Sequence, residues 1–146
     1  IIKKLLLILL FMMHICFAAQ KEVRIVSLAP NTTEVIYYLG AGENLVGVTD
    51  VDNYPEEVKR VKVIGGFTNP SIEMIIARKP THIYTSSSKR HPVSIKLEKM
   101  GYEIRDFAVN NMEDVLVMMR AISKEIDEGS SSINRFAEDL KAQREL

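Results

Sequence analysis

The sequence alternates between short runs of β-branched and aliphatic residues and longer segments whose apolar residues recur at helical spacing. The runs with strand character lie at 23–28, 45–49, 61–64, 82–85 and 103–107. Glycine and proline residues separate most of these runs from the helical segments. Strands and helices that alternate with short connections predict an α/β fold, in which helices flank a mostly parallel sheet.

Capping signals give the expected limits of the helices. Asn31 is expected to cap the first helix, with Glu34 as its partner in a capping box, and Gly40 to end it. Asn69, followed by proline, and Asn111 are expected to begin two later helices. A final helix is expected from about residue 130. Residues 141–146 carry no glycine, proline or other stop signal, so we expect the sequence to end within that helix.

The first twenty residues have the composition of a secretory signal peptide. Lys3 and Lys4 precede an apolar run at 5–13, and Ala18 and Ala19 supply the small residues of a cleavage site. This order predicts export and a periplasmic location. Two alternatives stay open: an uncleaved membrane anchor, and a lipid attached to Cys16, the only cysteine.

The overall charge and the loop motifs exclude several classes of function. Lys plus Arg equals Asp plus Glu, at 19 each, so the chain has no electrostatic footprint for nucleic acid. No cysteine–histidine cluster has zinc spacing, and no loop has a phosphate-binding glycine motif. No Ser/His/Asp set lies at a recognisable spacing. We therefore expect no enzyme activity, no resident metal and no cofactor.

In open α/β sheets, ligands bind at the carboxyl ends of the strands. Here the corresponding loops lie at 29–32, 50–54, 66–69 and 86–90. They contain an aromatic residue, amides and hydroxyls, a combination suited to apolar stacking with a few orienting hydrogen bonds. An alternative interpretation is a small enzyme or receiver-like domain that uses Asp50 or Asp52, although these residue types also favour ordinary turns.

Four motifs in the same order and spacing resemble a known family. They are R-I-V-S-L-A-P-N-T-T-E from Arg24, G-V-T-D-V-D-N-Y-P from Gly47, G-G-F-T-N-P-S-I-E from Gly65 and A-R-K-P-T-H-I-Y from Ala77. Together they resemble the N-terminal lobe of the helical-backbone substrate-binding proteins of ABC importers for cobalamin, haem and iron–siderophore complexes.

The resemblance implies two α/β lobes joined by one long helix, with the ligand held between the lobes. Under it, residues 1–20 are the signal peptide, 21–129 the N-terminal lobe and 130–146 the start of the interlobe helix, with the second lobe absent. The implied partners are the permease and ATPase subunits of an importer and a metal-chelate ligand, with the binding protein monomeric before docking.

The resemblance also implies site residues. The expected ligand-binding residues are Pro30, Asn31, Thr32, Val51, Phe67, Ser86 and Ser87. Glu73 corresponds to a surface glutamate that docks onto arginines of the permease. Each role has a structural alternative, because Phe67 could cover the end of the sheet and a carboxylate such as Glu73 is favoured in the first turn of a helix.

Overall fold

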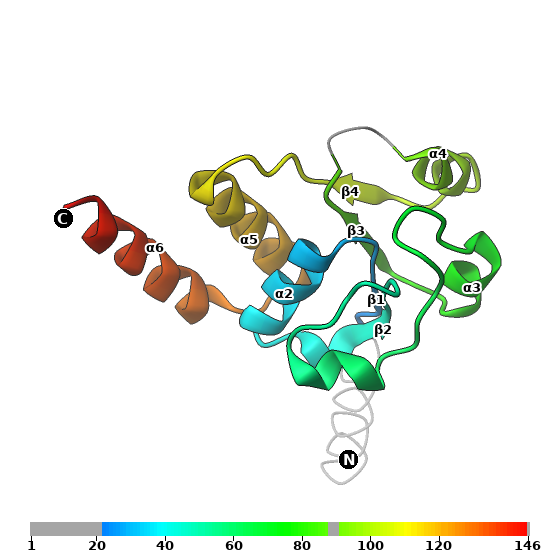
Figure 1. Cartoon of the computed structure of the whole chain (residues 1–146), viewed down its shortest axis with the longest axis horizontal. Coiled ribbons are helices and arrows are strands. Elements are labelled where there is room, and N and C mark those ends of the chain that lie inside the picture. Colours follow the sequence, from blue (N-terminus) through cyan, green and yellow to red (C-terminus); the bar gives the residue numbers. More distant parts are fainter. Residues whose placement is uncertain (1–21, 88–90, 146) are drawn as a thin grey trace, which may run out of the picture.

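The computed structural model describes residues 22–87 and 91–145 of the chain. Its centre is a four-stranded sheet in the order β2-β1-β3-β4, and every neighbouring pair of strands is parallel. The strands are β1 (Ile25–Ser27), β2 (Leu45–Gly47), β3 (His82–Thr85) and β4 (Ile104–Asp106). The predicted α/β class with a parallel sheet is confirmed (Figure 1).

Helices cover both faces of the sheet, as Figure 1 shows. The helices are α2 (Pro30–Tyr38), α3 (Ile72–Ala77), α4 (Pro92–Lys99), α5 (Met112–Ile126) and α6 (Ser130–Arg144), with short 3₁₀ turns at Gly42–Asn44 and Glu56–Arg60. Helices α2 and α5 lie on one face, and α3 and α4 on the other. Among the described residues, no helix is long and apolar enough to cross a membrane.

Alternating side chains of the central strands divide the core into two parts. Ile25 and Tyr84 point toward α2 and α5, whereas Val26 and Ile83 point toward α3 and α4. All four side chains are at most 2% exposed. Both faces of the sheet are therefore buried, which explains why the sequences of the strands are nearly continuous apolar runs.

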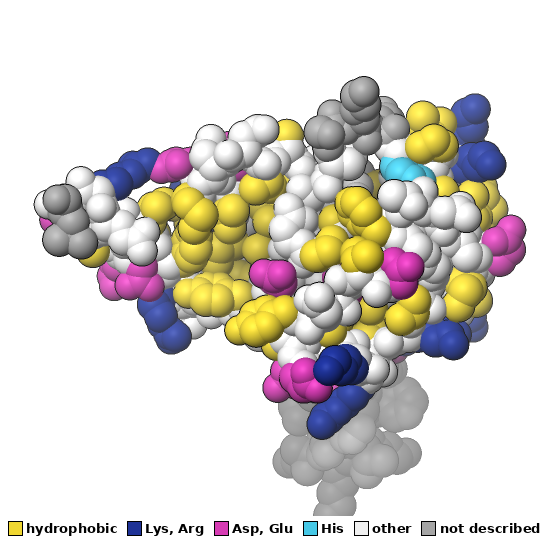
Figure 2. Space-filling model, in the orientation of Figure 1, with side chains coloured by type: hydrophobic (Ala, Val, Ile, Leu, Met, Phe, Trp, Pro, Cys, Tyr) yellow, Lys and Arg dark blue, Asp and Glu magenta, His cyan; other side chains and the backbone are white. Residues whose placement is uncertain are grey.

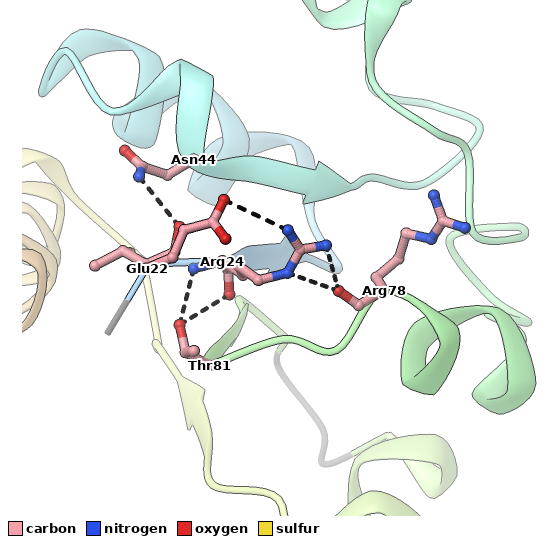
Figure 3. Close-up of polar contacts among 6 residues, drawn as sticks. Glu22, Arg24, Asn44, Arg78 and Thr81 are labelled. Carbon is pink, nitrogen blue, oxygen red and sulfur yellow. Dashed lines mark hydrogen bonds and ion pairs between the residues drawn. The ribbon is translucent and has the colours of Figure 1, made fainter. Parts of the chain in front are cut away.

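Contacts at the amino end of β1 attach α3 to the sheet. The Arg24 side chain donates from Nε and Nη2 to the carbonyl oxygen of Arg78, at 3.0 and 2.7 Å, where α3 ends (Figure 3). The Arg24 backbone N–H donates to Thr81 Oγ1 at 2.9 Å. A guanidinium group at a helix C-terminus satisfies a carbonyl that has no partner within the helix.

The predicted strand at 61–64 is wrong as an element. It is reduced to a single parallel bridge between Val48 and Val63 at the edge of the sheet. Val48 N–H donates to the Lys62 carbonyl and Ile64 N–H to the Val48 carbonyl, at 3.1 and 2.9 Å. The chain then leaves the sheet at Gly65, whose φ of +119° does not suit a strand.

Two of the predicted helix starts are displaced. Helix α2 begins at Pro30 with Ala29 as N-cap, so the capping box at Asn31 does not form. Proline is favoured in the first turn, which explains the earlier start. Helix α3 is capped by Ser71, whose Oγ accepts a hydrogen bond from the Met74 N–H, and not by Asn69.

Other boundaries agree with the predictions. Asn111 caps α5, because its side chain accepts a hydrogen bond from the Asp114 N–H. Gly40 follows α2 with a positive φ of +85°. Helix α6 begins at Ser130, close to the predicted start of the final helix. The predicted signal peptide at 1–20, with Cys16, lies outside the described residues.

Gly129 makes the tight connection between α5 and α6. Its φ is +83°, and a methyl group built on it would lie 2.6 Å from Leu39 Cδ2 and 2.8 Å from the Leu39 carbonyl oxygen. The chain therefore passes directly over the end of α2, and only glycine fits there.

We predict that Gly129→Ala destabilises the chain by more than about 2 kcal/mol, because a positive φ and a backbone collision both penalise the methyl group. Gly40→Ala is the matched control, since Gly40 has a similar φ of +85° but nothing within 4 Å of the built Cβ. Its expected cost is about 1 kcal/mol. Urea unfolding of both variants measures the difference; equal costs would show that the Leu39 contact is unimportant.

Candidate functional site

The loops that follow the parallel strands meet at the carboxyl-terminal end of the sheet, as the parallel topology requires. We call this end of the sheet the rim and define it by residues 29–32, 50–54, 65–69, 86–87 and Asp106. Asn31 Nδ2 donates to Ser86 Oγ at 2.8 Å, which joins the loops after β1 and β3. Ser87 donates from N–H and Oγ to the Asp106 carboxylate, at 3.0 and 2.9 Å, which joins those after β3 and β4.

The residues after β1 differ in their exposure to solvent. Pro30 and Asn31 are partly exposed on the rim. Thr32, by contrast, is fully buried, and its hydroxyl donates to the Ala29 carbonyl at 2.7 Å and contacts Ser27 Oγ at 2.5 Å. Thr32 therefore lies beneath the rim, where it fixes the turn into α2. It does not present its side chain at the surface, as a lining residue would.

Apolar side chains project from the next two loops. Phe67 is 40% exposed and Val51 is 46% exposed. The loop that carries Phe67 is attached to the loop after β2, because Asp50 N–H donates to the Gly65 carbonyl at 3.0 Å and Phe67 N–H donates to Asp50 Oδ1 at 3.1 Å. The structure thus brings all the predicted ligand-binding residues, apart from buried Thr32, to the surface of one edge.

The two aspartates of the alternative interpretation make local contacts. Asp52 Oδ2 accepts hydrogen bonds from the N–H and the hydroxyl of Thr49, at 2.9 and 2.5 Å, which is a turn contact of the kind that aspartate favours. Asp50 holds the backbone of Phe67. Within residues 22–87 and 91–145, no group of three or more His, Cys, Asp or Glu side chains is arranged to hold a metal ion.

Glu73 is exposed in the first turn of α3. A hydrogen bond from its own backbone N–H, together with the Ser71 hydroxyl at 3.0 Å from Oε2, lowers the pKa of the Glu73 carboxyl. The carboxylate therefore stays ionised at neutral pH, and it points into solvent, where it can meet a cationic partner.

Sequence reasoning missed an apolar hollow beside the rim. The hollow has a volume of about 420 Å³ and lies between α2, α5 and α6. Hydrophobic side chains gather there in Figure 2. Tyr38 of α2 and Phe136 of α6 meet edge to face across it, with ring centroids 6.2 Å apart. Helical spacing identified the apolar faces of these helices but could not tell which parts stay uncovered.

A buried tyrosine was also missed. Tyr84 donates its hydroxyl to Glu125 Oε2 at 2.9 Å, and Arg105 pairs with the same carboxylate at 2.8 Å. Burial, followed by the contact with Glu125, raises the pKa of Tyr84, so the phenol stays neutral. The hydrogen bond from the Tyr84 hydroxyl to Glu125 thus links β3 to α5.

Comparison with known proteins gives a consistent match. The model of the periplasmic binding protein family matches residues 25–142. The vitamin B12-binding protein of Vibrio vulnificus is 27% identical over 127 residues, which are 86% of this chain and 46% of that protein. An uncharacterized ABC transporter substrate-binding lipoprotein of Bacillus subtilis is 45% identical over 65 residues, or 44% of this chain and 20% of that protein.

Solved structures agree with the sequence relatives. The periplasmic vitamin B12-binding protein of Vibrio cholerae superposes with a TM-score of 0.74 and 28% identity, over 83% of this chain and 49% of that one. A periplasmic haem-binding protein of Pseudomonas aeruginosa has a TM-score of 0.73 at 20% identity, over 84% and 44%, and shares the fold. The chain spans about half the length of the curated relatives it matches. From its first strand into its last helix, the chain belongs to the periplasmic binding protein family.

Proposed function

We propose that this chain is the N-terminal lobe of an exported substrate-binding component of an ABC importer, which carries cobalamin or a haem-type or iron–siderophore chelate to a permease. The observation that carries the proposal is the rim, where hydrogen bonds connect the strand-end loops and leave Phe67 and Val51 projecting. Such a surface suits apolar contact with a bulky ligand.

The proposed class of ligand rests on the relatives and on the side chains that the rim exposes. The relatives of Vibrio vulnificus and Vibrio cholerae are vitamin B12-binding proteins. Among the residues that the family resemblance assigns to the ligand, Phe67 is the aromatic one, and Val51, Ser86 and Ser87 are small. One aromatic face supports stacking on a flat macrocycle, and the small side chains leave room for a bulky one.

The proposal treats the rim as one wall of a cleft. Tight sites bury most of a ligand's surface. A rim that is open on one side leaves a large part of a cobalamin-sized ligand in water, so the second wall must come from a further lobe. Residues 130–146 are then the start of the helix that joins the two, and α6 follows the lobe directly at Ser130.

We predict that the 146-residue chain binds cyanocobalamin and haemin at least about 100-fold more weakly than the full-length gene product, because half of the buried contact area is missing. Isothermal titration of both proteins with both ligands measures the difference. Submicromolar binding by the chain alone would contradict the two-wall model.

We predict that Phe67→Ala in the full-length protein weakens ligand binding about 5- to 50-fold, through loss of one stacked aromatic contact. Met100→Ala is the control, because Met100 is 56% exposed at the end of α4, on the opposite edge of the sheet. Equal effects of the two variants in fluorescence or absorbance titrations would exclude Phe67 from the site.

Glu73 is assigned to permease docking within the same proposal. Its exposed carboxylate can form a charge-assisted hydrogen bond with an arginine, a class of contact that contributes more than a neutral one. The contact lies on α3, outside the rim, so docking and ligand binding use different residues.

We predict that Glu73→Gln leaves ligand affinity unchanged but weakens binding to the reconstituted importer about tenfold, which loss of one charge-assisted contact would produce. Glu43→Ala is the control, since Glu43 is an exposed glutamate in the turn before β2, at the opposite edge. Ligand titrations and ATPase stimulation separate the two functions. A variant that lost ligand binding and kept importer binding would reverse the assignment.

A further inference from the structure

The loop that carries Phe67 is held by polar contacts on two sides. We call residues 65–69 the Phe67 loop. Its residues Phe67, Thr68 and Asn69 are exposed, so apolar burial contributes little to their position. Within the loop, the Asn69 N–H donates to the Gly66 carbonyl at 3.1 Å and closes a turn. What fixes this turn relative to the sheet must therefore come from outside the loop.

The first contact comes from Asp50, in the loop after β2. Asp50 N–H donates to the Gly65 carbonyl at 3.0 Å, and Asp50 Oδ1 accepts from the Phe67 N–H at 3.1 Å. The position of a Cβ on Gly66 would lie 3.4 Å from Asp50 Oδ2, so the loop backbone packs directly on the carboxylate. Asp50 thus fixes the backbone on both sides of Gly66.

The second contact comes from His91, the N-cap of α4. His91 Nδ1 accepts a hydrogen bond from the Val93 N–H at 3.1 Å, so this nitrogen carries no proton. In the neutral ring the proton is then on Nε2, which lies 3.0 Å from the Thr68 carbonyl oxygen and donates to it. One imidazole therefore caps α4 and holds the Phe67 loop, and it must be neutral to do both.

We infer that Asp50 and His91 are positioning residues that clamp the Phe67 loop from opposite sides and set the orientation in which Phe67 meets the ligand. The inference rests on the proposed function for its ligand-binding part, whereas the clamp itself is a property of the loop. Each residue acts through the backbone of the loop and has no need to touch the ligand.

His91→Asn tests the clamp, because asparagine is a good helix N-cap but is too short to reach the Thr68 carbonyl from the same position. Asp50→Ala removes the carboxylate that accepts from the Phe67 N–H and keeps the backbone bond to Gly65, while Asp50→Asn keeps an oxygen that can accept from the Phe67 N–H. We expect amide hydrogen exchange at 66–69 to speed up about 3- to 10-fold in His91→Asn and in Asp50→Ala, as the loss of one hydrogen bond implies, and to change little in Asp50→Asn.

The 146-residue chain is used for this measurement, with exchange in α4 as the internal control. We expect α4 to stay protected in His91→Asn. Nitrogen chemical shifts of the wild-type ring should report an unprotonated Nδ1 and a protonated Nε2. Unchanged exchange at 66–69 in both His91→Asn and Asp50→Ala, or a ring protonated on Nδ1, would overturn the clamp.

Titration of the full-length variants with cyanocobalamin and haemin tests the link to binding. We expect His91→Asn and Asp50→Ala each to weaken affinity about 3- to 10-fold and Asp50→Asn to retain it. If the wild-type protein binds a probe and the variants with a loosened loop bind it equally well, the positioning role is wrong. If the wild-type protein binds neither probe, the proposed function fails, and the exchange result still decides the clamp.

Discussion

Parallel pairing of β1 with both of its neighbours is the constraint on which the rest of the structure depends. Ile25 is in register with Leu45 on one side and with His82 on the other, so β1 is central and buried on both faces. Because every strand runs the same way, each connection must return to the opposite end of the sheet, and the helices do this. All strand-end loops then meet at one edge, which is why residues as distant in sequence as Asn31 and Ser86 form a hydrogen bond.

The rim is built from residues that satisfy one another. Asn31 bonds Ser86, Ser87 bonds Asp106 and Asp50 bonds the Phe67 loop. Loops that are bonded to one another in this way are preorganised, so a ligand need not order them on binding. Such a surface agrees with the relatives, whose names describe a vitamin B12-binding protein and an ABC transporter substrate-binding lipoprotein.

Local sequence signals predicted the elements except for the strand at 61–64, and long-range contacts decided their limits. The pattern at 82–85 predicted β3 to the residue, because a short run rich in β-branched and aromatic residues lies between a proline and a polar serine loop. Asn31 was a reasonable cap by composition, yet its side chain bonds a residue 55 positions away, and Pro30 starts the helix instead. Phe67 was predicted to follow a strand at 61–64; this segment forms only a bridge to Val48, yet it still carries Phe67 to the rim. Its support by His91 depends on a contact across 23 residues between a side chain and a carbonyl, which no local pattern encodes.

The composition of the rim limits how much selectivity this lobe can supply under the proposed function. Hydrogen bonds among the loops fix the backbone, so discrimination between ligands must come from the projecting side chains. Of these, Phe67 and Tyr54 offer aromatic faces and Val51 a small aliphatic contact. A difference of a few methylene groups against such a surface changes affinity only modestly, since each buried methylene contributes about 0.8 kcal/mol. Strong discrimination between a corrinoid and a haem therefore requires polar groups that one ligand satisfies and the other leaves unpaired, and those groups must come largely from the opposite wall of the cleft.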